Sequence, residues 1–375
     1  RWGRGQETYG EDPFLTSRLG VRFVEGMQGD DPDYLQAAAC AKHFAVHSGP
    51  ESDRHHFNAI VSKQDLWETY LPAFRALVKE AGVEAVMGAY NRTNGEPCCG
   101  SKTLLKDILR DKWHFDGHVT SDCWAIKDFH TGHMVTDGPV ESVALAVNNG
   151  CDLNCGDLSV YLEQAVAEGK LSEEKSEESL TRLYVTRMRL GMFDAEDQVP
   201  YNKVGYDVVD SAEMKALNLK VADSIMTLLK NDGTLPLDKS KLHTVGVIGP
   251  NADSRKALLG NYEGTASRYT TVLEGIEDYL GDDVKVRYSQ GCHLYADNIH
   301  GLAESNELMS EVKGVCEESD VVIAVLGLDS GLEGEEGDKG NQFASGDKPN
   351  LKLPGHQEEV RKACVGGGKP VVRLL

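Results

Sequence analysis

The sequence has no apolar run of 18 or more residues, and it has few basic residues for its acidic content. A membrane-spanning helix needs about 20 consecutive apolar residues, so no segment is expected to cross a membrane. Lys and Arg number 39 against 60 Asp and Glu, which gives a formal net charge of −21. Because binding phosphate groups requires clustered Lys and Arg, this balance excludes nucleic acid and anionic membrane surfaces and favours a neutral or cationic partner.

Cysteines are too few and too scattered for a dense disulfide framework. The chain has nine, an odd number, and no CxxC pattern of the kind that binds zinc. We expect free buried thiols, and the one conceivable bridge joins Cys123 to Cys155.

Metal and phosphate motifs are also missing. The pairs His55-His56 and His130-His133 come without an HExxH motif, so no metal is expected. The apolar run Val245 to Ile248 leads to Gly249-Pro250 without GxGxxG, and proline removes a backbone donor that a phosphate cradle would need. A ligand-binding α/β module is therefore only an alternative interpretation, and no cofactor is expected.

Both ends of the sequence resemble points at which a longer sequence has been cut. The first residue is Arg1, without a basic and apolar leader, and Lys369 to Leu375 reads as a strand broken off in mid-course. We expect a fragment of a longer protein, and the missing leader leaves its compartment open.

The first half of the chain alternates short apolar strands with amphipathic helices. Helical periodicity predicts helices over Ser62 to Ala81 and Thr103 to Lys112, and another from about Ser142. The predicted strands are Ala38 to Phe44, Val83 to Tyr90, Gly117 to Asp122 and Cys151 to Leu153. Strands separated by helices in this way indicate parallel βα units. Four units cannot close an eight-stranded barrel, so we expect the C-terminal half of a (β/α)8 TIM-like barrel over residues 1–193.

A helix over Ser172 to Leu190 and an irregular linker over residues 194–210 precede a second alternation. Its predicted elements are a helix over Ala212 to Lys230, a strand over Thr244 to Ile248, a helix over Thr271 to Leu280, a strand over Val284 to Tyr288, a helix over Leu302 to Glu317 and a strand over Val321 to Leu326. The continuously apolar strands are typical of a parallel sheet covered on both faces. Residues 211–375 are therefore expected to form a truncated α/β layer sandwich with a mainly parallel sheet.

Polar residues follow the predicted strands of the first half: Lys42-His43, Tyr90-Asn91, Asp122 and Asp152. The carboxyl ends of barrel strands carry the active residues, so Asp122 is the first candidate nucleophile. The alternative is that Asp122 caps the next helix. An unpaired charge on Lys42 beside an apolar run would cost folding free energy, so we expect Lys42 to pair with Asp122 or a substrate hydroxyl. Asp152 is expected to brace the last strand or bind a lysine.

Motifs along the whole chain resemble those of glycoside hydrolase family 3. They are Arg1-Trp2-Gly3-Arg4, Glu7-Thr8-Tyr9-Gly10-Glu11-Asp12-Pro13, Ala41-Lys42-His43-Phe44, Met87-Gly88-Ala89-Tyr90-Asn91, Asn94-Gly95-Glu96-Pro97, Val119-Thr120-Ser121-Asp122, Asp152-Leu153-Asn154-Cys155-Gly156, Gly249-Pro250-Asn251-Ala252, Gly260-Asn261-Tyr262 and Leu351-Lys352-Leu353-Pro354-Gly355-His356-Gln357. Their common order makes the resemblance far more specific than any single motif.

The resemblance implies a retaining, exo-acting β-glucosidase or β-xylosidase that acts on oligosaccharides or aryl glycosides. Asp122 would be the nucleophile, and Arg4, Lys42 and His43 would grip the sugar. Arg4 could also be a plain ion-pair partner of Glu7 or Asp12. A retaining glycosidase needs two carboxyls about 5–5.5 Å apart, and Asp122 must stay ionised, which Arg4 or Lys42 would favour.

The proton donor is expected on the Gly- and acid-rich loop from Asp329 to Gly346. Glu333 matches the β-xylosidase-like pattern, and Glu335 and Glu336 are the alternatives. A solvated acidic loop is the structural alternative. Tyr90 would contact the edge of the sugar, and Trp124 would stack on its face.

The resemblance also implies that part of the family's sugar site lies outside this sequence. The family's early barrel strands, with an Asp that holds the sugar's outer hydroxyls, would lie before Arg1, so a carbohydrate-binding fragment without turnover is a further alternative. Family members are typically periplasmic or extracellular. Glucose, xylose and arabinose specificity, linkage preference and oligomeric state do not follow from the sequence.

Overall fold

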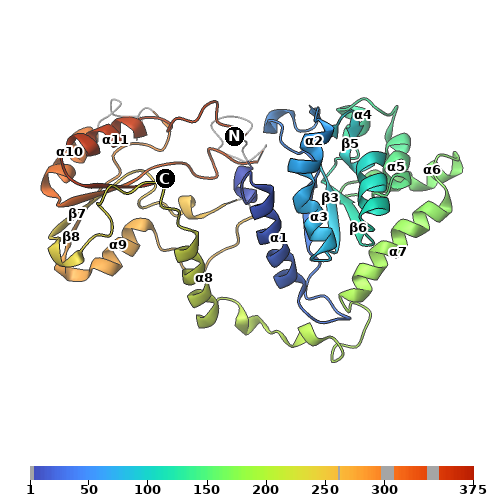
Figure 1. Ribbon diagram of the computed structural model, residues 1–375, viewed down its shortest axis with the longest axis horizontal. Helices are drawn as coiled ribbons and strands as arrows, with labels where there is room; N and C mark the ends of the chain where they lie inside the picture. Colours follow the sequence, from blue (N-terminus) through green and yellow to red (C-terminus); the bar gives the residue numbers. More distant parts are fainter. Residues whose placement is uncertain (1–3, 261, 297–307, 336–345) are drawn as a thin grey trace. The chain divides into compact units, whose positions relative to one another are not determined.

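The computed structural model describes residues 4–260, 262–296, 308–335 and 346–375. The chain divides into two compact units, an N-terminal unit over Arg4–Tyr206 and a C-terminal unit over Asp207–Leu375. Each unit is an α/β structure with mainly parallel strand pairing, so the predicted α/β class is confirmed (Figure 1). No helix within these described ranges has the length and apolar content needed to span a bilayer.

The N-terminal unit is organised around a parallel sheet with the order β1-β3-β6. These strands are β1 (Cys40–Phe44), β3 (Ala85–Gly88) and β6 (His118–Ser121). The fourth predicted strand is reduced to one parallel bridge between Thr120 and Leu153. Because all pairings are parallel, the carboxyl ends of the strands meet at one edge of the sheet.

A small second sheet, absent from the sequence prediction, takes one strand from before β3 and two strands from after it. It contains β2 (Asn58–Ala59), β4 (Arg92–Thr93) and β5 (Glu96–Pro97) in the order β2-β4-β5. Asn94 and Gly95 join β4 to antiparallel β5 with positive φ angles of 51° and 93°. A two-residue hairpin turn requires this backbone conformation, which Asn-Gly adopts readily.

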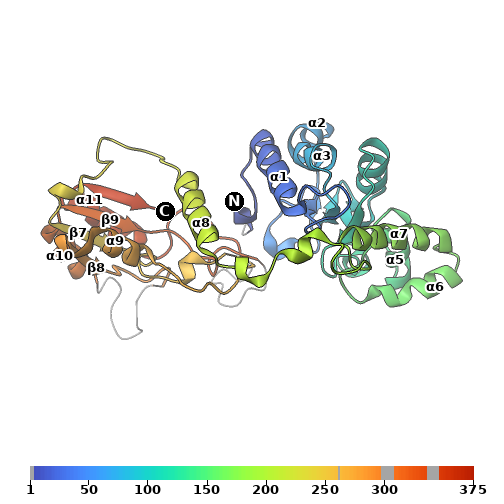
Figure 2. The same cartoon turned by 90° about the horizontal axis from the view of Figure 1, so that it is seen from below.

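Helices cover the sheet of the N-terminal unit. They are α1 (Pro13–Gln28), α2 (Lys63–Asp65), α3 (Pro72–Lys79), α4 (Asp128–Thr131), α5 (Pro139–Asn148), α6 (Leu162–Ala167) and α7 (Glu173–Arg189), with π-helices η3 (Leu66–Tyr70) and η5 (Lys102–Lys112). Helix α1 lies along α3 (Figure 1), and α5, α6 and α7 lie together (Figure 2). The predicted helix over Ser62 to Ala81 is divided because Pro72, which lacks a backbone N–H, starts a new helix at its first position.

Asp152 braces β6 through both carboxylate oxygens. Its Oδ2 accepts hydrogen bonds from Val119 N and Arg110 Nη2, both at 2.8 Å, and Oδ1 accepts one from Arg182 Nη1 at 2.8 Å. The prediction named the last strand or a lysine, whereas the carboxylate braces β6 and its charged partners are two arginines. A buried carboxylate with these bonds ties η5 and α7 to the strand that ends at Ser121.

The C-terminal unit contains an all-parallel sheet in the order β10-β9-β7-β8. Its strands are β7 (Thr244–Ile248), β8 (Lys285–Ser289), β9 (Val321–Val325) and β10 (Val371–Leu374), and its helices are α8 (Ala212–Ile225), α9 (Val272–Leu280), α10 (Met309–Glu318) and α11 (Gln357–Gly366). Residues 302–307, the predicted start of the helix before β9, lie outside the described residues. Helix α8 ends five residues before the predicted Lys230.

Successive strand residues in this unit face opposite sides of the sheet. Ile248 and Val322 pack with Val312 of α10 and Val360 of α11, whereas Val245 and Val321 pack with α9 on the other side. Figure 1 shows α10 and α11 on one side of the sheet and α9 on the other. Covering both faces explains why the strands are apolar at nearly every position.

Candidate active site

Asp122 follows the last residue of β6 and lies at the carboxyl edge of the N-terminal sheet. Its backbone N–H donates to Gly88 O at 3.2 Å, which ties the strand end to β3. Its Oδ1 accepts the N–H of Cys123 at 2.8 Å. The next helix, α4, has Lys127 at its N-cap, so the alternative that Asp122 caps that helix is wrong. Its carboxylate is instead held in the turn at the strand end.

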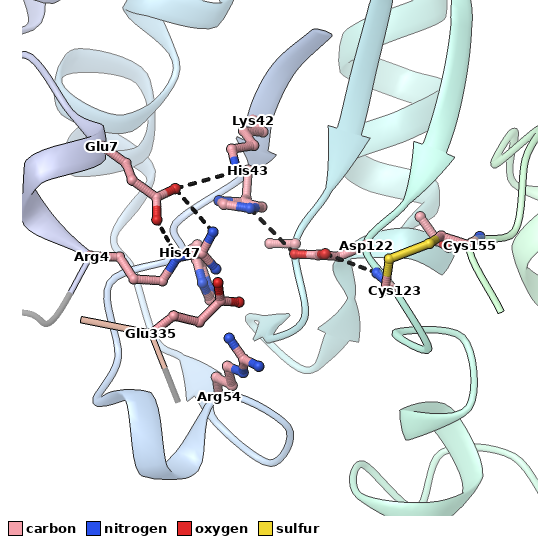
Figure 3. Close-up of polar contacts among 12 residues, drawn as sticks. Arg4, Glu7, Lys42, His43, His47, Arg54, Asp122, Cys123, Cys155 and Glu335 are labelled. Atoms are coloured by element: carbon pink, nitrogen blue, oxygen red, sulfur yellow. Dashed lines mark hydrogen bonds and ion pairs between the residues drawn. A yellow bond between two sulfur atoms is a disulfide. The ribbon is translucent and has the colours of Figure 1, made fainter. Parts of the chain in front are cut away.

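His43 faces the second oxygen of this carboxylate. Its Nε2 lies 3.3 Å from Asp122 Oδ2, and the His43 side chain is 5% exposed (Figure 3). Burial, followed by His47 and the cations around it, holds the pKa of His43 well below its usual value. The imidazole is therefore neutral at neutral pH and can hydrogen-bond without adding a charge.

Arg4 and Lys42 are held together by Glu7. Arg4 donates to Glu7 through Nε at 2.7 Å and Nη2 at 2.9 Å, and Lys42 Nζ lies 3.3 Å from Glu7 Oε2 (Figure 3). The ion pair of Arg4 with Glu7 is one of the predicted alternatives, whereas Asp12 caps α1 instead. The ion pair of Lys42 is with Glu7, not with the expected Asp122. Glu7 orients both cations, and only its spacing from Arg4 signals this in the sequence.

The pKa of Asp122 reflects opposing influences. Burial is the largest influence and raises it above its usual value. The hydrogen bond from Cys123 N and the charges of three cations oppose the rise: Arg4, Lys42 and Arg54. These cations favour the ionised carboxylate that a nucleophile requires.

Tyr90 follows the carboxyl end of β3 and is 6% exposed. The Arg54 guanidinium lies over its ring, with the central carbon 4.7 Å from the ring centroid, and the His55 ring is 4.7 Å away. Arg54, on a short turn after β1, is therefore a second site residue that sequence reasoning missed. Tyr90 as a sugar contact stays a prediction.

Trp124 is 55% exposed and has a positive φ of 60°. Its backbone N–H donates to Cys155 O at 2.6 Å, and a disulfide joins Cys123 to Cys155 (Figure 3). The conceivable bridge is thus formed. The other seven cysteines are free, and six of them are buried as expected; Cys40 is exposed. The disulfide anchors the turn that carries both Asp122 and Trp124.

The acidic loop belongs to the C-terminal unit. Glu333 Oε1 accepts the backbone N–H of Lys348 at 3.4 Å, and Glu335 Oε2 accepts the Tyr262 hydroxyl at 3.5 Å. Glu336 lies outside the described residues. Among the residues that the structure describes, no group of three or more His, Cys, Asp or Glu side chains is placed to hold a metal ion.

These features define an α/β protein with parallel sheets, in which a buried carboxylate at a strand end is surrounded by cationic and imidazole groups. Residues 1–186 match the Glycosyl hydrolase family 3 N terminal domain, and residues 226–375 match the Glycosyl hydrolase family 3 C-terminal domain. The chain belongs to glycoside hydrolase family 3, as its motifs predicted.

Two curated relatives illustrate the similarity. A xylan 1,4-beta-xylosidase of Xylanibacter ruminicola is 43% identical over 304 residues, which cover 80% of this chain and 35% of the relative. Beta-D-xylosidase 1 of Arabidopsis thaliana is 36% identical over 382 residues, which cover 100% of this chain and 47% of the relative. The chain thus spans less than half the length of these relatives.

Solved structures resemble the chain over nearly its whole length. A GH3 exo-beta-xylosidase (XlnD) in complex with a xylobiose aziridine activity based probe has a TM-score of 0.90 and 33% identity, covering 99% of this chain and 47% of that one. The beta-glucosidase from Listeria innocua in complex with isofagomine has a TM-score of 0.81 and 30% identity, covering 99% of this chain and 50% of that one.

Proposed function

We propose that the protein containing this chain is a retaining, exo-acting β-glycosidase that releases terminal β-D-xylosyl or β-D-glucosyl residues from oligosaccharides. The observation that carries the proposal is Asp122, a buried carboxylate at the end of β6 whose ionised form is favoured by three cations. The names of the two curated relatives support β-D-xylosides as the first substrates to assay.

In this mechanism Asp122 attacks the anomeric carbon and forms a covalent glycosyl-enzyme, which water then hydrolyses. Arg4 and Lys42 bind sugar hydroxyls as donors, positioned by Glu7. His43 is neutral, so it can form a hydrogen bond in the site without adding a positive charge. Tyr90 and Trp124 complete the proposed sugar site. The architecture proposed with it is the C-terminal half of a (β/α)8 barrel, followed by a partial α/β layer sandwich that carries the proton donor.

The proton donor is proposed to be Glu333. Glu335 is the second candidate; its Oε2 accepts the hydroxyl of Tyr262, whereas Glu333 Oε1 accepts the backbone N–H of Lys348. Replacing each of Glu333, Glu335 and Glu336 by Ala, with added azide, identifies the donor: azide needs no general base, so it restores turnover in the variant that lacks the acid/base.

The nucleophile is tested on the full gene product that contains this chain, with nitrophenyl β-xyloside and nitrophenyl β-glucoside. Asp122→Asn is expected to lower kcat on the order of 10³-fold or more, because the amide cannot attack the anomeric carbon. Asp116→Asn, an exposed acidic residue just before β6, is the matched control and should stay near the wild-type rate. Turnover that survives in Asp122→Asn refutes the assignment.

The two alternatives give different results in the same assay. A carbohydrate-binding fragment without turnover would bind xylose or glucose but release no nitrophenol. A ligand-binding α/β module would neither bind these sugars nor hydrolyse their glycosides.

A further inference from the structure

We infer that Gln357 is a positioning residue for general acid catalysis, because it fixes the start of the acidic loop that carries Glu333 and Glu335. The inference rests on the proposed function, since it concerns the proton donor of that reaction. It assigns no contact with substrate to Gln357 itself. The residue acts through the backbone of the loop.

Gln357, the first residue of α11, is fully buried. Its Oε1 accepts the backbone N–H of Gly327 at 2.8 Å, and its Nε2 donates to Gly327 O at 2.9 Å. The same Nε2 donates to Leu294 O at 2.7 Å. One side-chain amide thus satisfies both backbone groups of the residue at which the chain leaves β9 for the loop.

Only an amide of this length can make these bonds at once. A carboxylate could accept from Gly327 N–H but could not donate to the two carbonyls, and an apolar side chain could do neither. Gly327 has a φ of 130°, a conformation that other residues rarely adopt. Without the amide, buried backbone groups would lose their partners, at a cost that favours a different path for the loop.

Hydrogen bonds in the turn after Gly327 connect the position of Gly327 to that of the glutamates. Asn251 Nδ2 donates to Leu328 O at 3.0 Å, and Asp329 Oδ1 accepts Gly331 N–H at 2.9 Å. Leu332 is fully buried, and its N–H donates to Asp329 O at 3.0 Å. Glu333 follows at once, so a shift at Gly327 would displace its carboxyl.

A hydrogen bond also joins the two ends of the loop base. Gly334 N–H donates to Gly346 O at 3.1 Å. A Cβ added to Gly346 would lie 2.1 Å from Gly334 O, and the φ of Gly346 is 90°. This close approach of Gly334 and Gly346 joins the chain just before Glu335 to the chain at the end of the loop.

The distinguishing measurement is the dependence of kcat/KM on the leaving group. A proton donor matters when the leaving group is poor, as in xylobiose, and matters little for a dinitrophenol, which leaves as a stable anion. The ratio kcat/KM reports steps up to glycosyl-enzyme formation, so it isolates the protonation of the leaving oxygen. A residue that only stabilises the fold would lower both values equally.

The experiment compares Gln357→Leu with the wild-type gene product on xylobiose and dinitrophenyl β-xyloside. We expect kcat/KM for xylobiose to fall about tenfold or more, and that for the dinitrophenyl substrate to fall less than about twofold. The matched control is Gln28→Leu, a buried amide that bridges Gly82 O and Glu84 N in the N-terminal unit. Gln28→Leu should change kcat/KM for both substrates by the same factor.

A second variant guards against misfolding of Gln357→Leu. Asn251→Ala removes only the bond to Leu328 O and should show the same leaving-group dependence to a smaller extent. Equal losses on both substrates in both variants would overturn the inference. A wild-type protein inactive on both substrates would instead overturn the proposed function, and the positioning role with it.

Discussion

The carboxyl of Asp122 and the imidazole of His43 lie 3.3 Å apart where little water reaches. Burial favours the neutral form of each, so it raises the pKa of Asp122 and lowers the pKa of His43. Arg4, Lys42 and Arg54 act differently on the two groups: they oppose the rise for Asp122 and add to the fall for His43. The cations therefore favour an ionised carboxylate beside a neutral imidazole.

This arrangement predicts the pH dependence of a Lys42→Met variant. The proposed nucleophile works only when ionised, so kcat/KM falls as the pH falls through the pKa of Asp122. Lys42 lowers that pKa, so removing its charge raises it. The acid limb of the pH profile should therefore move to higher pH, measured with nitrophenyl β-xyloside.

Lys102→Met is the matched control for this shift. Lys102 is exposed and pairs with Asp107 on η5, so the acid limb should stay at its wild-type position. An acid limb that is unchanged in Lys42→Met would show that Lys42 does not set the ionisation of the nucleophile.

At this scale the sequence predicted site residues but not their pairings. Arg4 and Lys42 each pair with Glu7, and His43 lies beside Asp122, while the roles that the motifs give these residues stay predictions. The expected pairing of Lys42 with Asp122 was wrong, because a strand-end position gives a direction and not a distance; its pairing with a substrate hydroxyl stays a prediction. The β1-β3 pairing shifts its register between Ala41 and Phe44, so simple alternation of faces fails there. Arg54 was missed because it belongs to a turn without periodicity.

At the scale of elements, the end of β6 is fixed on two sides. Asp152 ties the strand to η5 and α7 through arginines, and the Cys123–Cys155 disulfide ties the following turn to the chain after Leu153. Ser121 Oγ also accepts Cys155 N–H at 3.0 Å. Such support suits the proposed role of Asp122 as a nucleophile, because small displacements weaken catalysis strongly.

Removing the disulfide is expected to cost stability. A bridge over a sequence separation of 32 residues lowers the entropy of the unfolded chain. The double variant Cys123→Ser/Cys155→Ser should therefore lose about 3–4 kcal/mol of unfolding free energy, measured by urea denaturation of the gene product. Cys40→Ser, at the exposed free thiol, should lose much less. Equal losses in both proteins would contradict a role for the bridge.

Helices and strands were predicted where periodicity is strong and missed where local chemistry decides. Apolar runs marked β1, β3, β6, β7 and β9. Helix α1 was not predicted, although Asp12 caps it and Pro13 occupies its first position, both of which are sequence signals. The Asn94-Gly95 hairpin was also readable, but its strands are too short to show alternation.

At the scale of the whole molecule, the ordered motifs were sufficient to predict the family and the α/β class. Where one domain ends and the next begins is a different question, because motifs mark sites and not boundaries. The compact units divide between Tyr206 and Asp207. That residues 194–210 form a linker between separately folded domains remains a prediction.

Limited proteolysis tests this organisation. Lys203 and Tyr206 are exposed, and Tyr206 is 88% accessible, in a stretch of short 3-10 helices. Proteases cleave exposed segments that can unfold locally at little cost, whereas bonds inside α7 or β7 are protected by packing. Brief treatment with chymotrypsin should therefore cut first after Tyr206, and trypsin after Lys203, as read by mass spectrometry of the products.

A Tyr206→Ala variant tests whether chymotrypsin cleaves at this exposed residue itself. Chymotrypsin should no longer cut at position 206, while tryptic cleavage after Lys203 should continue at the same rate. The fragment that starts at Asp207 should unfold cooperatively in urea, because its sheet has its own clusters of buried side chains on both faces. First cuts within β7 to β10, or a fragment without a cooperative transition, would show that the C-terminal unit depends on the rest of the chain to fold.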